Sequence, residues 1–242
     1  MIHESLPFRK SFSTVINAFV QDNKMNNIFI VDFFEDFNNQ IYYLEEKGNE
    51  LSSEAIKFLL TELFLVANSI FIKYKRLDIV SSLINHLYFD KRRHKNVSFY
   101  IFRHPTRIIF EGKLSKESKR VSLTADFMKE RSTEKEFKNM IETDMLLYFV
   151  SNINPIGNSN SYSIWFPLTY IYLHRINERI SIISALKSRK VLEDMLPIFG
   201  VSEIEFIERI KTIPEEMGYR NSWESIPNFE RYIKGDEIGT TT

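Results

Sequence analysis

Apolar residues between Ile56 and Phe71 cover more than one side of a helix, and this segment constrains the fold more than any other. A helix that is apolar on most sides has to be surrounded by other elements. Ser52 stands where it could cap the helix, and Leu51 where it could pack on Ile56. We therefore expect a central core helix, with apolar positions at Ile56, Leu59, Leu60, Leu63, Phe64, Val66, Ala67, Ile70 and Phe71.

The apolar stretch from Phe58 to Ile72 is also the best candidate for a membrane span, but it is short and contains Glu62 and Asn68. A spanning helix needs roughly 20 apolar residues, and an acid at the bilayer centre costs about 2.5–3.5 kcal/mol. The first ten residues lack the basic start and apolar stretch of a secretory signal. We expect a cytoplasmic protein that does not contact a membrane.

The composition narrows the possible chemistry. The 242-residue chain has no cysteine, which excludes disulfides, thiol nucleophiles and cysteine-ligated metals and is typical of a reducing compartment. Only seven glycines are present, which argues against a loop-rich all-β fold and against glycine-cradled nucleotide sites. Length alone does not choose between one large domain and two small ones.

Helical periodicity occurs on both sides of the central segment. A stripe with three- and four-residue spacing runs from Ile30 to Leu44 and predicts one helix. Pro167 suits the first turn of a long helix that reaches Leu186. Residues 239–242 are expected to be disordered. Two further helices should begin at capping boxes, which pair Thr133 with Glu136 and Ser202 with Glu205.

Between the helical regions the apolar period changes from 3.6 to 2. Val97, Phe99 and Ile101 alternate with other side chains, and a similar alternation surrounds Leu123 and Ala125. Together with 108–110, these runs predict a three-stranded antiparallel β-meander over about 96–126. The fold class expected is α+β and mainly helical, with a bundle-like helical body and this meander in the middle of the chain.

One loop is the best candidate for a domain boundary. Residues 152–163 contain Pro155, Gly157 and four asparagines. The sequence therefore predicts a helical region plus meander over 1–151 and a helical region over 164–242, packed as one compact unit.

A block of positive charge coincides with the predicted meander. Residues 91–120 hold ten Lys or Arg against Glu111 and Glu117, a net charge of +8. The whole chain has 32 basic and 32 acidic residues, so the remainder carries −8. Concentrated positive charge attracts phosphate or an acidic surface.

This block suits nucleic acid because cations neutralise phosphate while an exposed ring can stack on an unpaired base. A short helix ending in residues 91–95 and followed by a hairpin resembles the helix-plus-wing layout of winged-helix DNA-binding proteins. We expect a non-enzymatic regulatory or accessory protein. Its phosphate contacts would be Arg92, Arg93, Lys95, Arg103, Arg107, Lys116, Lys119 and Arg120, with Tyr100 as the stacking ring.

Two other interpretations fit the same charges without nucleic acid. The basic segment could dock an acidic protein surface, including this chain's own acidic C-terminal third. Lys and Arg also protect exposed strand edges from pairing with other chains, in which case the charges serve solubility alone.

A third interpretation is enzymatic. Asp90 precedes Glu111-Gly-Lys113 by twenty-one residues, a pattern that is similar to the Asp…Glu-x-Lys motif of the restriction-endonuclease-like family. The resemblance implies two carboxylates that hold Mg²⁺ and a Lys that orients water. Two departures weaken it, since Asp90 lies at a predicted helix end and glycine occupies the middle position. Outside this alternative, no metal or cofactor is expected.

Overall fold

A computed structural model describes the protein at residues 3–21, 26–48, 50–103, 122–155, 164–176, 180–213, 216–217, 225–226 and 228–241. The chain forms two compact units, Met1–Met140 and Ile141–Thr242. Helix α8 (Glu134–Ile153) contains the boundary between them. The predicted division into 1–151 and 164–242 stays a prediction.

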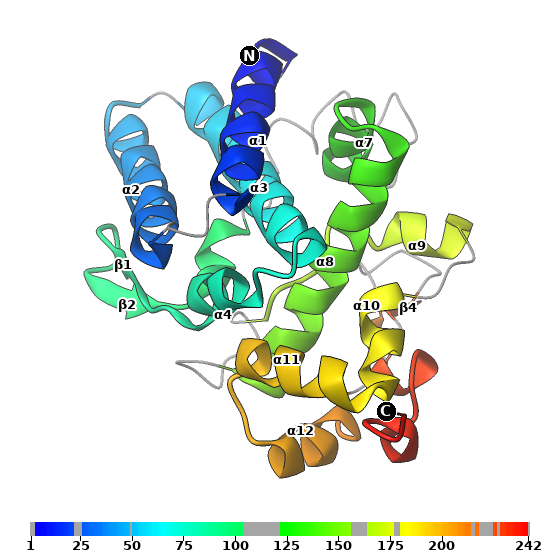
Figure 1. Ribbon diagram of the computed structural model, residues 1–242. Coiled ribbons are helices and arrows are strands. Elements are labelled where there is room, and N and C mark those ends of the chain that lie inside the picture. The colour runs from blue at the N-terminus through cyan, green and yellow to red at the C-terminus, as the bar shows by residue number, and fades with distance from the viewer. Residues whose placement is uncertain are drawn as a thin grey trace. The chain divides into compact units, whose positions relative to one another are not determined.

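The first unit is mostly helical (Figure 1). Its elements before α8 are η1 (His3–Ser5), α1 (Leu6–Gln21), α2 (Asn27–Glu46), α3 (Glu50–Lys73), α4 (Leu77–Asn85), β1 (Tyr88–Asp90), β2 (Lys95–Val97), the 3₁₀ turn η2 (Phe99–Phe102) and α7 (Leu123–Glu130).

Helix α3 is the core of this unit, as its wide apolar surface predicted. It packs against α1, α2, α4 and η2, and Leu60, Leu63 and Phe64 are fully buried. The helix begins at Glu50, so Ser52 lies inside its first turn instead of capping it. Aromatic rings fill the space around it, with Phe64 at 4.9 Å from Phe102 between ring centroids.

Within the described residues, one helical stretch, Ser52–Lys73, is long and apolar enough to cross a membrane, and most of its apolar window is buried inside the protein. Glu62 and Asn68, two of the polar residues in that stretch, are fully buried as well. A helix buried in the core of a folded protein has the same length, hydropathy and burial, so these properties alone do not indicate a membrane span.

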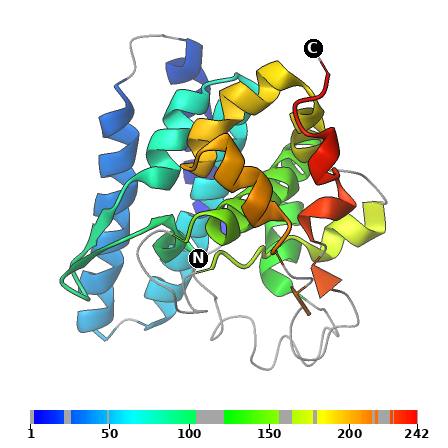
Figure 2. The same cartoon turned by 90° about the horizontal axis from the view of Figure 1, so that it is seen from below.

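The predicted meander is not what forms. One two-stranded antiparallel hairpin is present instead, with Tyr88 opposite Val97 and Asp90 opposite Lys95. It lies beside the end of α2 in both ribbon views (Figures 1 and 2). The alternating run after Val97 is the 3₁₀ turn η2, because three of its four side chains are buried rather than every second one.

The third predicted strand is a helix. The Ser122 Oγ accepts a hydrogen bond from the Ala125 N–H at 3.2 Å and so caps α7. This cap satisfies the Ala125 N–H within the segment itself. In an extended strand the same N–H would need a carbonyl of a neighbouring strand. The second predicted strand, 108–110, lies outside the described residues.

The second unit is built from the C-terminal part of α8 and from shorter elements. These are α9 (Ile171–Ile176), α10 (Ser181–Ser184), η4 (Ala185–Lys187), α11 (Arg189–Phe199), α12 (Glu203–Ile210), β3 (Glu216–Met217), β4 (Ser225–Ile226), η5 (Phe229–Arg231) and η6 (Gly235–Glu237). Strands β3 and β4 pair antiparallel.

Both predicted capping boxes are present. Glu136 accepts the N–H of Thr133 at 2.9 Å at the start of α8, and Ser202 with Glu205 caps α12. Residues 239–241 are ordered, contrary to the prediction, since Thr241 exchanges backbone hydrogen bonds with Lys187 and Arg189; Thr242 lies outside the described residues.

The long helix predicted after Pro167 does not begin there, and Asp144 explains why. This fully buried carboxylate accepts the Thr169 N–H at 2.7 Å and the Trp165 Nε1–H at 2.7 Å. The segment before Ile171 follows an irregular path, and the Asp144 side chain satisfies the buried N–H groups of Thr169 and of the Trp165 indole.

We expect Asp144→Ala to destabilise the protein by about 2–4 kcal/mol, since each buried donor left without a partner costs about 1–3 kcal/mol. Urea denaturation measures this loss. Asp194→Ala, the same change at an exposed position of α11, should alter the free energy of unfolding little. Equal effects from the two substitutions would contradict the role given to Asp144.

Candidate functional site

The exposed turn of the β1–β2 hairpin gathers four of the five Lys and Arg residues that the structure describes in the charged block. Lys91, Arg92, Arg93 and His94 connect the two strands, and Lys95 begins β2. His94 has a φ of 48°, in the left-handed region that tight turns use. We call residues 91–95 the basic turn.

Asp90 shapes this turn from within. Its Oδ1 accepts the Arg92 N–H at 3.0 Å, and its backbone oxygen accepts the Arg93 N–H at 3.2 Å. This is the local side-chain-to-backbone pattern by which aspartate stabilises turns. Asp90 lies on strand β1 and not at a helix end, so that part of the sequence interpretation was wrong.

Helix α2 holds the hairpin in place through two polar side chains. Asn39, which is 2% exposed, donates to the Phe89 carbonyl at 2.9 Å and accepts the Lys91 N–H at 3.0 Å. Glu35 Oε2 accepts the Phe89 N–H at 2.7 Å. The outer edge of β1 is therefore satisfied by side chains of α2, which fixes the position of the turn.

Tyr88 anchors the other face of the hairpin in the core. Its ring is fully buried and lies 4.5 Å from that of Phe102. The hydroxyl donates to the Leu83 carbonyl at 2.6 Å. Burial, with a smaller contribution from the charge of Glu35, raises the pKa of Tyr88 well above its ordinary value. The hydroxyl thus serves as a neutral donor to the backbone.

Carboxylates of the same molecule neutralise part of the basic turn. Arg92 Nη1 lies 3.2 Å from Glu45 Oε2, and Arg93 Nε lies 3.4 Å from Asp90 Oδ2. Lys91 Nζ is 5.5 Å from the centre of the Tyr43 ring. The side chains of Arg92 and Arg93 remain 64% and 53% exposed. An exposed pair such as Arg92–Glu45 contributes about 0–1 kcal/mol, so a phosphate could compete for Arg92.

The structure brings together only part of the predicted contact set. The basic turn contains Arg92, Arg93 and Lys95. Tyr100 is half-buried in η2, and Arg103 directly follows η2. The remaining predicted contacts lie outside the described residues: Arg107, Lys116, Lys119 and Arg120. The predicted helix ending in residues 91–95 is wrong as well, because α4 ends at Asn85.

The nuclease pattern gains no support at Asp90. This residue is 7% exposed, and both of its carboxylate oxygens already contact arginine groups of the turn. Glu111 and Lys113 lie outside the described residues. Among the residues that the structure does describe, no group of three metal-ligating side chains is found.

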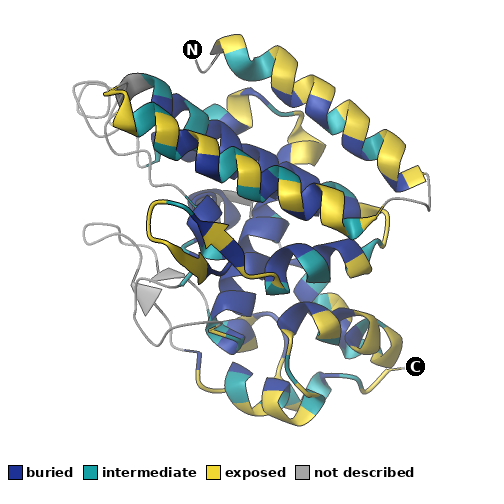
Figure 3. Cartoon of the chain, turned by 90° about the vertical axis from the view of Figure 1, so that its left-hand side faces the viewer, coloured by how far each residue is buried: buried dark blue, intermediate teal, exposed yellow. Residues whose placement is uncertain are grey.

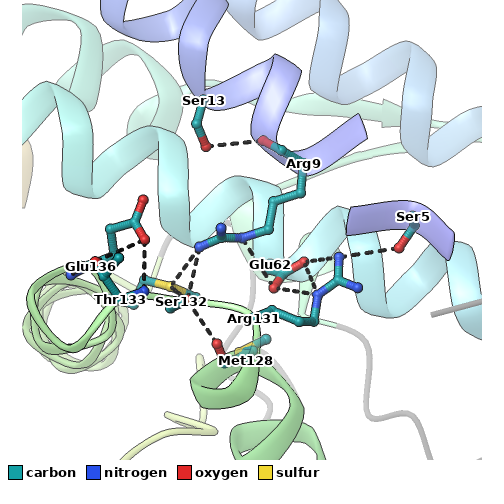
Figure 4. A network of polar contacts seen from close by, with 10 residues as sticks. Ser5, Arg9, Ser13, Glu62, Met128, Arg131, Ser132, Thr133 and Glu136 are labelled. Atoms are coloured by element: carbon teal, nitrogen blue, oxygen red, sulfur yellow. Dashed lines mark hydrogen bonds and ion pairs between the residues drawn. The ribbon is translucent and has the colours of Figure 1, made fainter. Parts of the chain in front are cut away.

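A second polar cluster, which sequence reasoning missed, lies inside the first unit (Figure 4). Glu62 of α3 is fully buried, and Arg9 of α1 and Arg131 at the end of α7 are 2% and 5% exposed. Arg131 contacts Glu62 through Nε at 3.0 Å and Nη2 at 2.9 Å, while Arg9 Nε lies 3.3 Å from Oε1. Arg9 also donates to Ser132 Oγ at 2.9 Å.

All these contacts of the Glu62 carboxylate are with guanidinium donors, which is the arrangement that an ionised acid needs. Burial raises the pKa of Glu62, and the hydrogen bonds and charge of Arg131, with the charge of Arg9, oppose that rise. An acid inside an apolar helix signals that a cation must lie nearby. The sequence could not say which of the 32 Lys and Arg residues it would be.

Comparisons with known proteins supply no relative from which a function could be inferred, because no protein-family model, curated protein or solved structure matched the chain. The interpretation of function therefore depends on the geometry described above.

We expect Glu62→Gln to destabilise the protein by about 3–5 kcal/mol, because it leaves two buried guanidinium groups without a counter-charge. Chemical denaturation measures the effect, and Glu208→Gln, at an exposed position, is the matched control. Adding Arg9→Met to Glu62→Gln should recover part of the loss. A loss below about 1 kcal/mol would mean that the cluster is not held together by charge.

Proposed function

We propose that the protein associates with nucleic acid in a regulatory or accessory role, without catalysing a reaction, through the basic turn and the charged segment that follows it. The observation that supports this most is that five consecutive basic residues, Lys91 to Lys95, form an exposed turn whose backbone is fixed by α2. A fixed turn presents its cations without a large entropic cost on binding.

The charge and exposure of the turn favour phosphate over bases as its target. Long cationic side chains that point into solvent meet the backbone of either DNA or RNA, which supplies affinity but carries no sequence information. Tyr100 is half-buried, so stacking on a base would contribute less than the charges do. We therefore expect weak discrimination between sequences and a steep dependence on salt.

Replacing Arg92, Arg93 and Lys95 together with serine should reduce the affinity for a labelled oligonucleotide. The slope of log K against log salt should fall by about 2–3, since each phosphate contact contributes about 0.7–0.9. Fluorescence anisotropy at several salt concentrations measures both quantities. The control replaces Lys10, Lys190 and Lys211, which are exposed elsewhere on the chain, and removes the same net charge.

Several outcomes of that experiment would reject the proposal. An absence of binding by the unmodified chain at low salt removes it, and an equal loss in both triple variants shows that overall charge and not the turn is responsible. Cleavage of the oligonucleotide on addition of Mg²⁺, abolished by Glu111→Gln, would favour the nuclease alternative. Capture of an acidic protein that survives nuclease treatment would favour the docking alternative.

The position of the turn should matter as well as its charge. We expect Asn39→Ala to weaken oligonucleotide binding several-fold without changing the net charge, because it removes both hydrogen bonds from α2 to the hairpin. Faster amide hydrogen exchange within residues 88–97 should accompany the loss. Gln40→Ala changes the exposed neighbour of Asn39 and should leave affinity and exchange unchanged. Unaltered binding by Asn39→Ala would show that turn placement is unimportant.

A further inference from the structure

Helix α1 has apolar residues on two sides, and in the part of the chain that the structure describes only one of these sides is buried. Phe12, Ile16 and Val20 are 9%, 2% and 5% exposed and face the core. Phe8, Val15 and Phe19, on the other side, are 48%, 49% and 47% exposed. A surface helix normally has one apolar stripe. The packing of the described elements of this unit does not account for the second stripe.

The outer stripe of α1 and the neighbouring face of α2 enclose a groove with a volume of about 460 Å³. Phe12 and Phe33 stack inside it with ring centroids 5.3 Å apart. Phe29, on the α2 side, is 70% exposed. Exposed residues run along the outward side of both helices (Figure 3).

The described residues that line this groove are uncharged. Its lining is made of aromatic and aliphatic side chains with two polar ones, Ser11 and Asn26. Of the two charged residues in α1, Arg9 is buried at Glu62, and Lys10 is not part of the lining. Enrichment in aromatic residues and depletion of charge distinguish the core of a protein interface from the rest of a surface.

The exposed aromatic side chains supply part of the area that a subunit contact needs. At about 200 Å² for an aromatic side chain, the exposed fractions of Phe8, Phe19 and Phe29 amount to roughly 330 Å². A standard interface buries about 800 Å² on each partner. Val15 and the exposed residues Ser11, Thr14 and Ala18 along the same side of α1 add to that area.

We propose that this groove is the contact face of a homodimer, in which the α1–α2 pair of one copy packs on the same pair of another. A symmetric dimer needs a face that is complementary to itself, and this face carries both a hollow and, in Phe29, a ring that stands beside it. The absence of charge in the lining also means that two identical faces meet without like-charge repulsion.

A second copy fits these observations better than a small apolar ligand does. A ligand inside the groove would contact its lining, Phe29 included, but would leave uncovered Thr14 and Ala18, which are exposed on α1 outside the lining. The helix pair of another copy covers the lining and these two residues together. Two helix pairs packed in this way make a four-helix arrangement, which is a common and stable form of helix association.

Sedimentation velocity over a concentration series tests the proposal. We expect a dimer for the unmodified chain and a monomer for Phe29→Glu, which places a charge in the contact without disturbing the core. Ile204→Glu is the matched control, because Ile204 of α12 is 73% exposed and lies in the other unit. It should dimerise like the unmodified chain. Circular dichroism checks that both variants keep their helices.

Cross-linking locates the contact independently. The chain has no cysteine, so Val15→Cys introduces a single thiol on the groove face, and mild oxidation should yield a disulfide-linked dimer. Ile204→Cys should not. A chain that stays monomeric at every concentration overturns the proposal, whether or not an apolar ligand binds. So does a Phe29→Glu variant that dimerises normally, or a dimer in which only Ile204→Cys cross-links.

Discussion

The first unit depends on one buried carboxylate. Glu62 lies in the middle of the core helix α3 and is fully buried, and burying an ionised acid there is unfavourable unless cations accompany it. Arg9 and Arg131 meet this requirement from α1 and from the end of α7. Three segments that are far apart in sequence are thereby brought to one point. Arg131 also lies at the C-terminal end of α7, where the helix dipole favours a positive charge and offsets part of the cost of burying it.

Helix α1 has only two charged residues, Arg9 and Lys10, and Arg9 pairs with Glu62 in the core. Arg9 has to reach inward to Glu62, and the neighbouring inward positions pack on the core. The polar residues that would ordinarily cover the outward side are replaced by Phe8, Val15 and Phe19. On the opposite flank of α2, Glu35, Asn39 and Glu45 contact the hairpin and its basic turn. One helix thus has an apolar flank toward α1 and a polar flank that positions cations.

The parts of the fold that could be predicted from sequence are those set by local chemistry. The central helix follows from the apolar positions between Ile56 and Phe71, and two helix starts follow from capping boxes. Local chemistry could not exclude the meander. The apolar pattern of Phe99–Phe102 and the alternation around Leu123 are compatible with a strand and equally with a buried turn or a helix. Long-range partners decided the outcome: α3 buries the side chains of η2, and Asp144 removes the first turns of the helix expected after Pro167.

The candidate site was likewise predictable only in part. The concentration of charge is visible in the sequence, but its placement depends on Asn39 and Glu35, which have no recognisable spacing relative to the turn. Partial neutralisation by Glu45 and Asp90 was equally invisible. Both carboxylates hold arginines that stay more than half exposed, so they orient these side chains at little cost to their availability. A polyanion that displaced Glu45 would leave that carboxylate beside Lys57, 2.6 Å away, so the exchange would not strand a lone acid.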